Sequence, residues 1–176
     1  MLGELTYTSI DDEIVDRCAR GMLVLRVPLA PGAPIRRMML IGEDLHNELT
    51  SPEGDDEWEK RVGELMADLD HFVGGEHIHC KYLFLLSPAR ENVWEIRSVR
   101  DQPSIRVLGL FAKKDTFVAT NFARRDALGG WESKAWKHVK LVARSTWRKI
   151  FSVYNPESFT NIHQLVSGAI DGKYVK

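Results

Sequence analysis

Residues 93–125 read VWEIRSVRDQPSIRVLGLFAKKDTFVATNFARR and carry the clearest structural signal of the chain. They contain three short runs of β-favouring residues, each of which begins or ends at an arginine. Turn-forming residues separate the runs at 101–103 and 113–115. Because the connections are too short for crossover helices, the runs are expected to form an antiparallel meander.

The segments on either side extend this pattern. Residues 77–86, HIHCKYLFLL, supply a fourth strand before the meander. An amphipathic helix is expected before that strand, because apolar residues recur at helical spacing and a Gly-Gly pair follows them: Trp58, Val62, Leu65, Leu69 and Phe72. A second amphipathic helix is expected over residues 131–151, with Trp136, Val139, Ala143, Trp147 and Ile150 on its apolar face.

The order of these elements predicts the α+β class, with a twisted antiparallel sheet of about four strands and helices packed on one face. We expect a core at residues 53–151, an N-terminal extension of unknown role at 1–52 and a C-terminal tail at 152–176. Within the extension, residues 22–29 and 36–41 favour strands, and 43–49 favour a short helix. The tail is expected to hold one short helix around 162–170 or to be only partly ordered.

Composition fits a single folded domain. The chain has 176 residues, of which 44% are hydrophobic, and its longest apolar runs are far shorter than a bilayer span. The acidic N-terminus lacks the basic and apolar regions of a secretory signal, so we expect a cytoplasmic protein without a membrane partner. Cys18 and Cys80 form no CxxC motif and are expected to be reduced and structural.

Charge is distributed unevenly along the chain. Residues 1–88 contain 8 Lys and Arg against 17 Asp and Glu, whereas residues 89–151 contain 14 against 6. The basic block is expected to be a solvated face, an anion-binding surface or a docking surface for an acidic partner. The acidic half could fold over this basic face or form the opposite surface.

The succession of arginine-bearing strands resembles the RelE/HigB family of toxin endoribonucleases, including related phage-derived proteins. The family pattern of an "ElR" strand, an "R-V-x-x" strand and a strand ending in "F-K-K" is matched here by WEIR at 94–97, RVLGLF at 106–111 and FARR at 122–125. The resemblance covers about residues 57–151, and the helix at 58–72 stands where the family has a helical hairpin. Residues 1–52 have no counterpart.

The resemblance implies a toxin that cuts mRNA, in association with the ribosome, by attack of a 2′-hydroxyl on the neighbouring phosphate. It implies a cognate antitoxin and no cofactor or metal, because guanidinium groups can stabilise the extra phosphate charge. The catalytic set carried over from the family is Glu95, Arg97, Arg106, Arg124 and Arg125. Glu95 and Arg97 share a strand face, where they could pair or could act as base and phosphate clamp.

Some residues depart from the family pattern. A C-terminal tyrosine or histidine base has no clear match, although His138, Tyr154 and His163 are available. Arginines replace the lysine pair after the last strand, which keeps the charge but removes an easily tuned proton donor. The predicted RNA-binding residues are basic side chains of the expected turn and last helix: Lys113, Lys114, Lys137, Lys140, Arg144 and Arg148.

Two functions remain open from the sequence. The first is the toxin endoribonuclease, and the second is a non-catalytic, phage-derived module that uses the same face to bind nucleic acid or an acidic protein. The cluster of His77, His79 and Cys80 is a weak metal ligand set without distant partners, so no metal site is expected. Trp94, Trp131, Trp136 and Trp147 could stack on bases, but their spacing favours the core.

Overall fold

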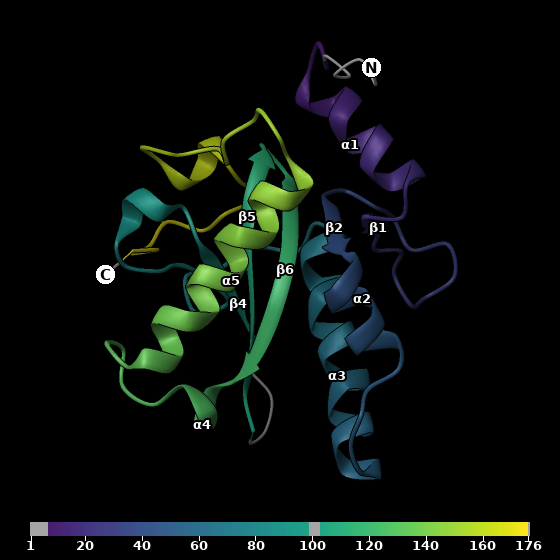
Figure 1. Cartoon of the computed structure of the whole chain (residues 1–176), viewed down its shortest axis with the longest axis vertical. Coiled ribbons are helices and arrows are strands. Elements are labelled where there is room, and N and C mark those ends of the chain that lie inside the picture. The colour runs from purple at the N-terminus through teal and green to yellow at the C-terminus, as the bar shows by residue number, and fades with distance from the viewer. Residues whose placement is uncertain (1–6, 99–102, 176) are drawn as a thin grey trace, which may run out of the picture.

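The computed structural model describes residues 7–98 and 103–175, which form an α+β structure around one mixed sheet (Figure 1). Its strands are β1 (Leu23–Leu25), β2 (Met38–Gly42), β3 (Leu83–Leu85), β4 (Trp94–Arg97), β5 (Ile105–Lys113) and β6 (Thr116–Arg124). The order across the sheet is β1-β2-β6-β5-β4-β3. The helices are α1 (Ile10–Ala19), α2 (Glu43–Thr50), α3 (Asp56–Val73), α4 (Arg125–Leu128) and α5 (Lys134–Ile150), with short 3-10 turns at Ala89–Glu91 and Ile162–Gln164.

The sheet is larger than the four antiparallel strands that the sequence predicts. The expected meander is present as β3 to β6, which pair antiparallel in sequence order. The N-terminal region adds β1 and β2, and β2 pairs with β6 in parallel. Parallel pairing needs a long connection, and here α2, α3 and the strands β3, β4 and β5 lie between β2 and β6. This length allows β6 to run beside β2 in the same direction. The turn predicted at 101–103 lies largely outside the described residues.

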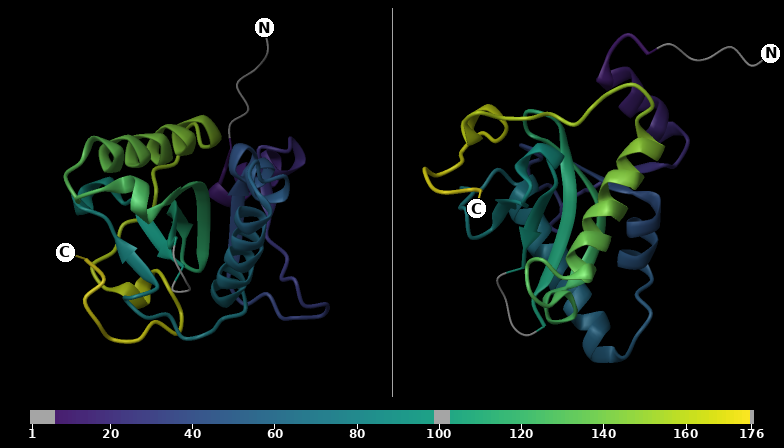
Figure 2. Two further views of the ribbon diagram at one scale, coloured as in Figure 1. Left: turned by 90° about the horizontal axis from the view of Figure 1, so that it is seen from below. Right: turned by 60° about the vertical axis from the view of Figure 1, so that its left-hand side comes forward.

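Helices cover both faces of the sheet, so the prediction of helices on one face is wrong. Alternate residues of β5 enter two different cores: Val107 and Phe111 pack with α3, whereas Leu108 and Leu110 pack with α5. The left view of Figure 2 shows α5 on one side of the sheet and the C-terminal segment on the other. Burial on both faces explains why β5 is almost continuously apolar, a pattern that does not reveal which face is covered.

The two long predicted helices are present, and local sequence fixes where each begins. The side chain of Asp55 accepts a hydrogen bond from the backbone N–H of Trp58 at 2.9 Å at the start of α3. Ser133 accepts from the N–H of Trp136 at 3.1 Å at the start of α5. Each cap satisfies a donor that the first helical turn leaves unpaired. In the part of the chain that the structure describes, no helix is long and apolar enough to cross a bilayer.

The two terminal segments are built into the same cores. The N-terminal half contributes β1, β2 and α2, together with α1, whose buried Glu13 accepts hydrogen bonds from Ser152 at 3.0 and 3.1 Å. The C-terminal segment crosses the α3 side of the sheet and buries Ile162, Leu165 and Val166. Its described residues contain a 3-10 turn and are held by these apolar contacts and by isolated β-bridges at Ala169 and Val175.

Candidate nucleic-acid interface

Side chains of β4 and β5 place a carboxylate and two guanidinium groups on the α5 face of the sheet. Glu95 and Arg97 are two residues apart on β4, and Arg97 lies opposite Arg106 in the β4–β5 register. Nε of Arg97 lies 2.6 Å from Oε1 of Glu95, and Nε of Arg106 lies 3.3 Å from Oε2. We call these three residues the arginine cluster.

Glu95 is the buried centre of the arginine cluster. Its side chain has no exposed surface, whereas 21% of the Arg97 side chain and 15% of the Arg106 side chain are exposed. Burial raises the pKa of the Glu95 carboxyl, against the opposing charges of Arg97, Arg106 and Arg125. Burial also lowers the pKa of Arg106, and Glu95 opposes that shift. The carboxylate therefore lies behind two partly exposed cations.

The structure separates the two arginines at the end of β6. Arg125 lies close enough to the arginine cluster for its charge to act on the pKa values of Glu95 and Arg106, and its guanidinium lies 5.8 Å from the ring centre of Trp131. Arg124 lies over Trp58 of α3, at 5.7 Å from the ring centre, and pairs with Asp126 at 2.8 Å. Because Trp58 packs in the other core, Arg124 lies on the opposite face from Glu95.

A hollow of about 370 Å³ adjoins the arginine cluster, and we call it the first hollow. It is lined by Phe84, Leu86, Ser87, Pro88, Trp131, Glu132, Trp136, Lys137 and Lys140. Phe84 connects the two features, because the guanidinium of Arg97 stacks 4.4 Å from its ring centre. Trp131 stacks on Trp136 with ring centres 4.8 Å apart and remains 41% exposed. The surface therefore combines cations with an accessible aromatic ring.

The predicted RNA-binding side chains fall into two groups. Lys137 and Lys140 line the first hollow, and Arg144 and Arg148 follow them along α5. Lys113 and Lys114 lie at the β5–β6 turn, seven residues from Arg106 along β5 and therefore roughly 23 Å away. Lys113 also pairs with Asp11 of α1. The turn is thus remote from the arginine cluster.

The alternative proton donors and acceptors lie elsewhere. The hydroxyl of Tyr154 donates to the backbone carbonyl of Tyr7 at 3.4 Å, and Nε2 of His163 lies 2.8 Å from Asp171. His138 is exposed on α5 and does not line the first hollow. Among the residues brought together at the arginine cluster, Glu95 is the carboxylate for which the sequence left two roles open, an ion pair with Arg97 or a base.

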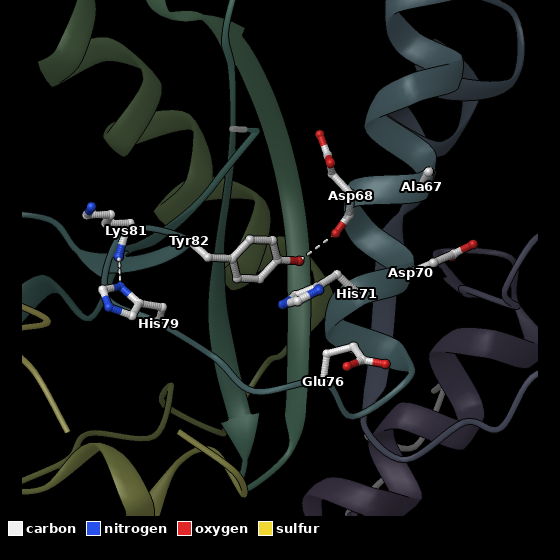
Figure 3. A pocket seen from close by; sticks show the side chains of 8 residues that line it. All are labelled: Ala67, Asp68, Asp70, His71, Glu76, His79, Lys81 and Tyr82. Atoms are coloured by element: carbon white, nitrogen blue, oxygen red, sulfur yellow. Dashed lines mark hydrogen bonds between the residues drawn. The ribbon is translucent and has the colours of Figure 1, made fainter. Parts of the chain in front are cut away.

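A separate hollow of about 750 Å³ lies beside α3 and is shown in Figure 3. Its lining combines carboxylates and His71 from α3 and the turn that follows it with His79 and Lys81 from the segment before β3. One of its carboxylates is neutralised, because Asp70 forms an ion pair with Arg26 at 2.8 Å. Within residues 7–98 and 103–175, no three His, Cys, Asp or Glu side chains are grouped so that they could hold a metal ion. This hollow lacks the excess of cations found along α5.

Sequence reasoning did not identify two residues of the α5 surface. Phe84 follows the apolar pattern of β3 and reads as core, but it lies opposite Glu95 in the β3–β4 register, with the guanidinium of Arg97 over its ring. Arg90 lies in the β3–β4 connection, beside α5. The cross-strand register would have identified Phe84, and the position of α5 would have identified Arg90. A linear sequence pattern reveals neither the register nor the position of the helix.

Comparison with known proteins gives no family assignment. A scan against protein-family models finds no match, and neither do searches of curated proteins and of solved structures.

Proposed function

We propose that this protein binds RNA through the arginine cluster and the first hollow, and that it acts as a metal-independent endoribonuclease of the RelE/HigB toxin class. The observation that carries the proposal is the pair of Arg97 and Arg106 around Glu95 beside a hollow with two lysines and with exposed Trp131, over which Arg125 lies. Guanidinium groups bind phosphate through paired hydrogen bonds, and aromatic rings stack on unpaired bases.

The order of elements around the arginine cluster supports the same class. The helix α3 precedes the β3–β6 meander, where the family has a helical hairpin, and the basic helix α5 follows it. On this proposal, α3, the meander and α5 form a RelE-like core, and the elements of residues 7–52, α1, β1, β2 and α2, are an addition to it. We also propose that cleavage takes place on the ribosome and that a cognate antitoxin binds the protein. These two parts of the proposal are supported by the family resemblance alone.

The proposed reaction transfers a phosphoryl group within the RNA strand. The 2′-oxygen forms a bond to phosphorus while the bond from phosphorus to the 5′-oxygen of the next nucleotide breaks. A base takes the proton of the 2′-hydroxyl, and an acid protonates the departing 5′-oxygen. The products are a 2′,3′-cyclic phosphate and a 5′-hydroxyl. Arg97 and Arg106 would stabilise the additional negative charge on the phosphate oxygens.

We assign Glu95 the role of base, because the substrate phosphate would replace Glu95 as the partner of both arginines. In the free protein, both arginines hold the carboxylate. A phosphate that binds Arg97 and Arg106 weakens their attraction for Glu95, so burial then raises the pKa of Glu95 further. The carboxylate becomes a stronger proton acceptor as the substrate phosphate arrives.

The substitution Glu95→Gln tests this assignment. It preserves the size of the side chain and removes the base, so the variant should bind RNA at least as tightly as the unmodified chain. Cleavage should fall by about 10²–10⁴-fold, the usual contribution of a general base. The measurement is mapping of new RNA 5′ ends in bacteria and with purified protein, and unchanged cleavage by Glu95→Gln would exclude Glu95 as the base.

A second candidate function is a non-catalytic RNA-binding or acidic-protein-binding module. Complete burial of Glu95 favours it, because a structural carboxylate that orients two arginines needs no access to substrate. This candidate predicts RNA binding by the unmodified chain without cleavage and without growth arrest. The same 5′-end map therefore separates the two functions.

A further inference from the structure

A second basic hollow lies farther along α5. Its volume is about 590 Å³, and its lining includes Arg90, Asn92, Arg144, Trp147, Arg148 and Asn155. Arg144 pairs with Glu91 at 3.0 Å. Within the described part of the chain, neither Arg90 nor Arg148 forms an ion pair, and both are exposed. This second hollow therefore contains two cations that are available to an external anion.

The first and second hollows share both of their walls. The connection from Ser87 to Asn92 lies opposite α5 and contributes to each hollow. Two side chains of α5 join the walls: Nζ of Lys140 donates to the carbonyl of Ser87 at 2.5 Å, and Arg144 pairs with Glu91. The hollows are thus successive parts of one surface between α5 and this connection.

Helical spacing arranges the cations of this surface in a line. Lys137, Lys140, Arg144 and Arg148 are three, four and four residues apart, so they follow one side of α5. Lys137 and Arg148 are eleven positions apart, which corresponds to roughly 16 Å along the helix axis. A linear polyanion that enters at the first hollow can therefore reach the second.

We infer that α5 and the Ser87–Asn92 connection form an extended binding track for single-stranded RNA, with the second hollow holding phosphates next to the nucleotides at the arginine cluster. The inference rests on the proposed function and specifies the strandedness and extent of its substrate. Arg90 and Arg148 bind the backbone, and Trp131 stacks on a base at the other end. Trp131 favours a single strand because bases within a duplex are already stacked on each other.

Binding of RNAs that differ in length and strandedness tests the track. We would measure dissociation constants by fluorescence anisotropy for a 2′-O-methyl dinucleotide, an octanucleotide and an octanucleotide duplex, since 2′-O-methylation blocks cleavage. The octanucleotide single strand should bind more tightly than both the dinucleotide and the duplex. Equal affinity for the duplex, or equal competition by poly-glutamate, would overturn the assignment to single-stranded RNA.

Variants of the second hollow test its contribution directly. Arg90→Ala/Arg148→Ala should weaken octanucleotide binding by about tenfold and leave dinucleotide binding unchanged. The slope of log affinity against log salt should lose about 1.4 in magnitude, at about 0.7 for each phosphate contact of a single strand. The matched control is Lys134→Ala/Lys149→Ala, which removes two exposed charges of α5 outside both hollows.

The outcomes separate this inference from the proposed function. If the two double variants weaken octanucleotide binding equally, the track is wrong, although binding at the arginine cluster can still hold. If the unmodified chain binds neither the dinucleotide nor the octanucleotide, the proposed function itself fails. Selective loss of octanucleotide affinity in Arg90→Ala/Arg148→Ala supports both.

Discussion

At Glu95, burial and neighbouring charge act in opposite directions on one carboxyl group. Burial favours its neutral form and raises its pKa, whereas Arg97 and Arg106 favour the charged form. The sequence predicted that Glu95 and Arg97 share a face, because they are two residues apart on a strand. It could not predict the depth of burial, which depends on α5 covering this side of the sheet.

The raised pKa of Glu95 makes a prediction about pH and stability. A carboxyl whose folded pKa lies above its unfolded value, about 4.3, binds more protons in the folded state, so stability falls as pH rises through that interval. Glu95→Gln does not titrate. The stability of Glu95→Gln relative to the unmodified chain, measured as the difference in free energy of unfolding in urea, should therefore increase from pH 4 to pH 7. A shift in the opposite direction would mean that the arginines lower the pKa below its ordinary value.

Among the elements, β5 shows most clearly what a linear pattern can predict. Its apolar run identified a strand, and the turns on either side identified the meander. The parallel partner of β6 is β2, which is separated from it by more than seventy residues, and no local signal records that pairing. The arginines of β4 and β5 were therefore predictable as neighbours, but the surface formed with α5 required the tertiary structure.

Gly109 on β5 is a specific requirement of this sheet. It lies at an irregularity of the β5–β6 register, where an added Cβ would lie 2.5 Å from the Phe117 ring and would also meet the carbonyl of Val118. Gly109→Ala should destabilise the protein by about 1–3 kcal/mol, the usual cost of overpacking. The measurement is the free energy of unfolding in urea.

Gly63→Ala is the control for this prediction. Gly63 is an exposed position within α3, and an added Cβ there meets no atom within 4 Å. The substitution should stabilise the protein by about 1 kcal/mol, because alanine favours a helix over glycine. Equal effects of the two substitutions would argue against close packing at Gly109.

At the scale of the whole molecule, the acidic and the basic parts of the sequence supply different strands of the sheet. The acidic N-terminal half supplies β1 and β2 at one edge, β3 at the other edge, and α3, whereas the basic block supplies the strands between them, β4, β5 and β6, and α5. Since β6 and β5 separate β2 from β4, residues 7–52 form the opposite edge of the sheet and do not cover the arginine cluster. The N-terminal half therefore has a structural role in this fold.

Deletion of residues 1–52 tests that structural role. The deletion removes β2, which pairs with β6, and also the buried side chains of Met39, Ile41, Leu45 and Leu49. The remaining chain should lose cooperative thermal unfolding, as followed by circular dichroism. A soluble fragment with a cooperative transition would show that residues 53–176 fold independently.

The central claim is that RNA phosphate binds at the arginine cluster. Its most direct test is the dissociation constant of a 2′-O-methyl RNA octanucleotide for the unmodified chain, Arg106→Gln and Arg124→Gln at one salt concentration. Both variants lose one positive charge, but Arg106 lies beside Glu95 and Arg124 lies on the opposite face. We predict that Arg106→Gln weakens binding by about 10- to 100-fold, as for loss of hydrogen bonds to a charged group, and that Arg124→Gln has little effect. Equal weakening by both substitutions, with both variants folded, would contradict the claim.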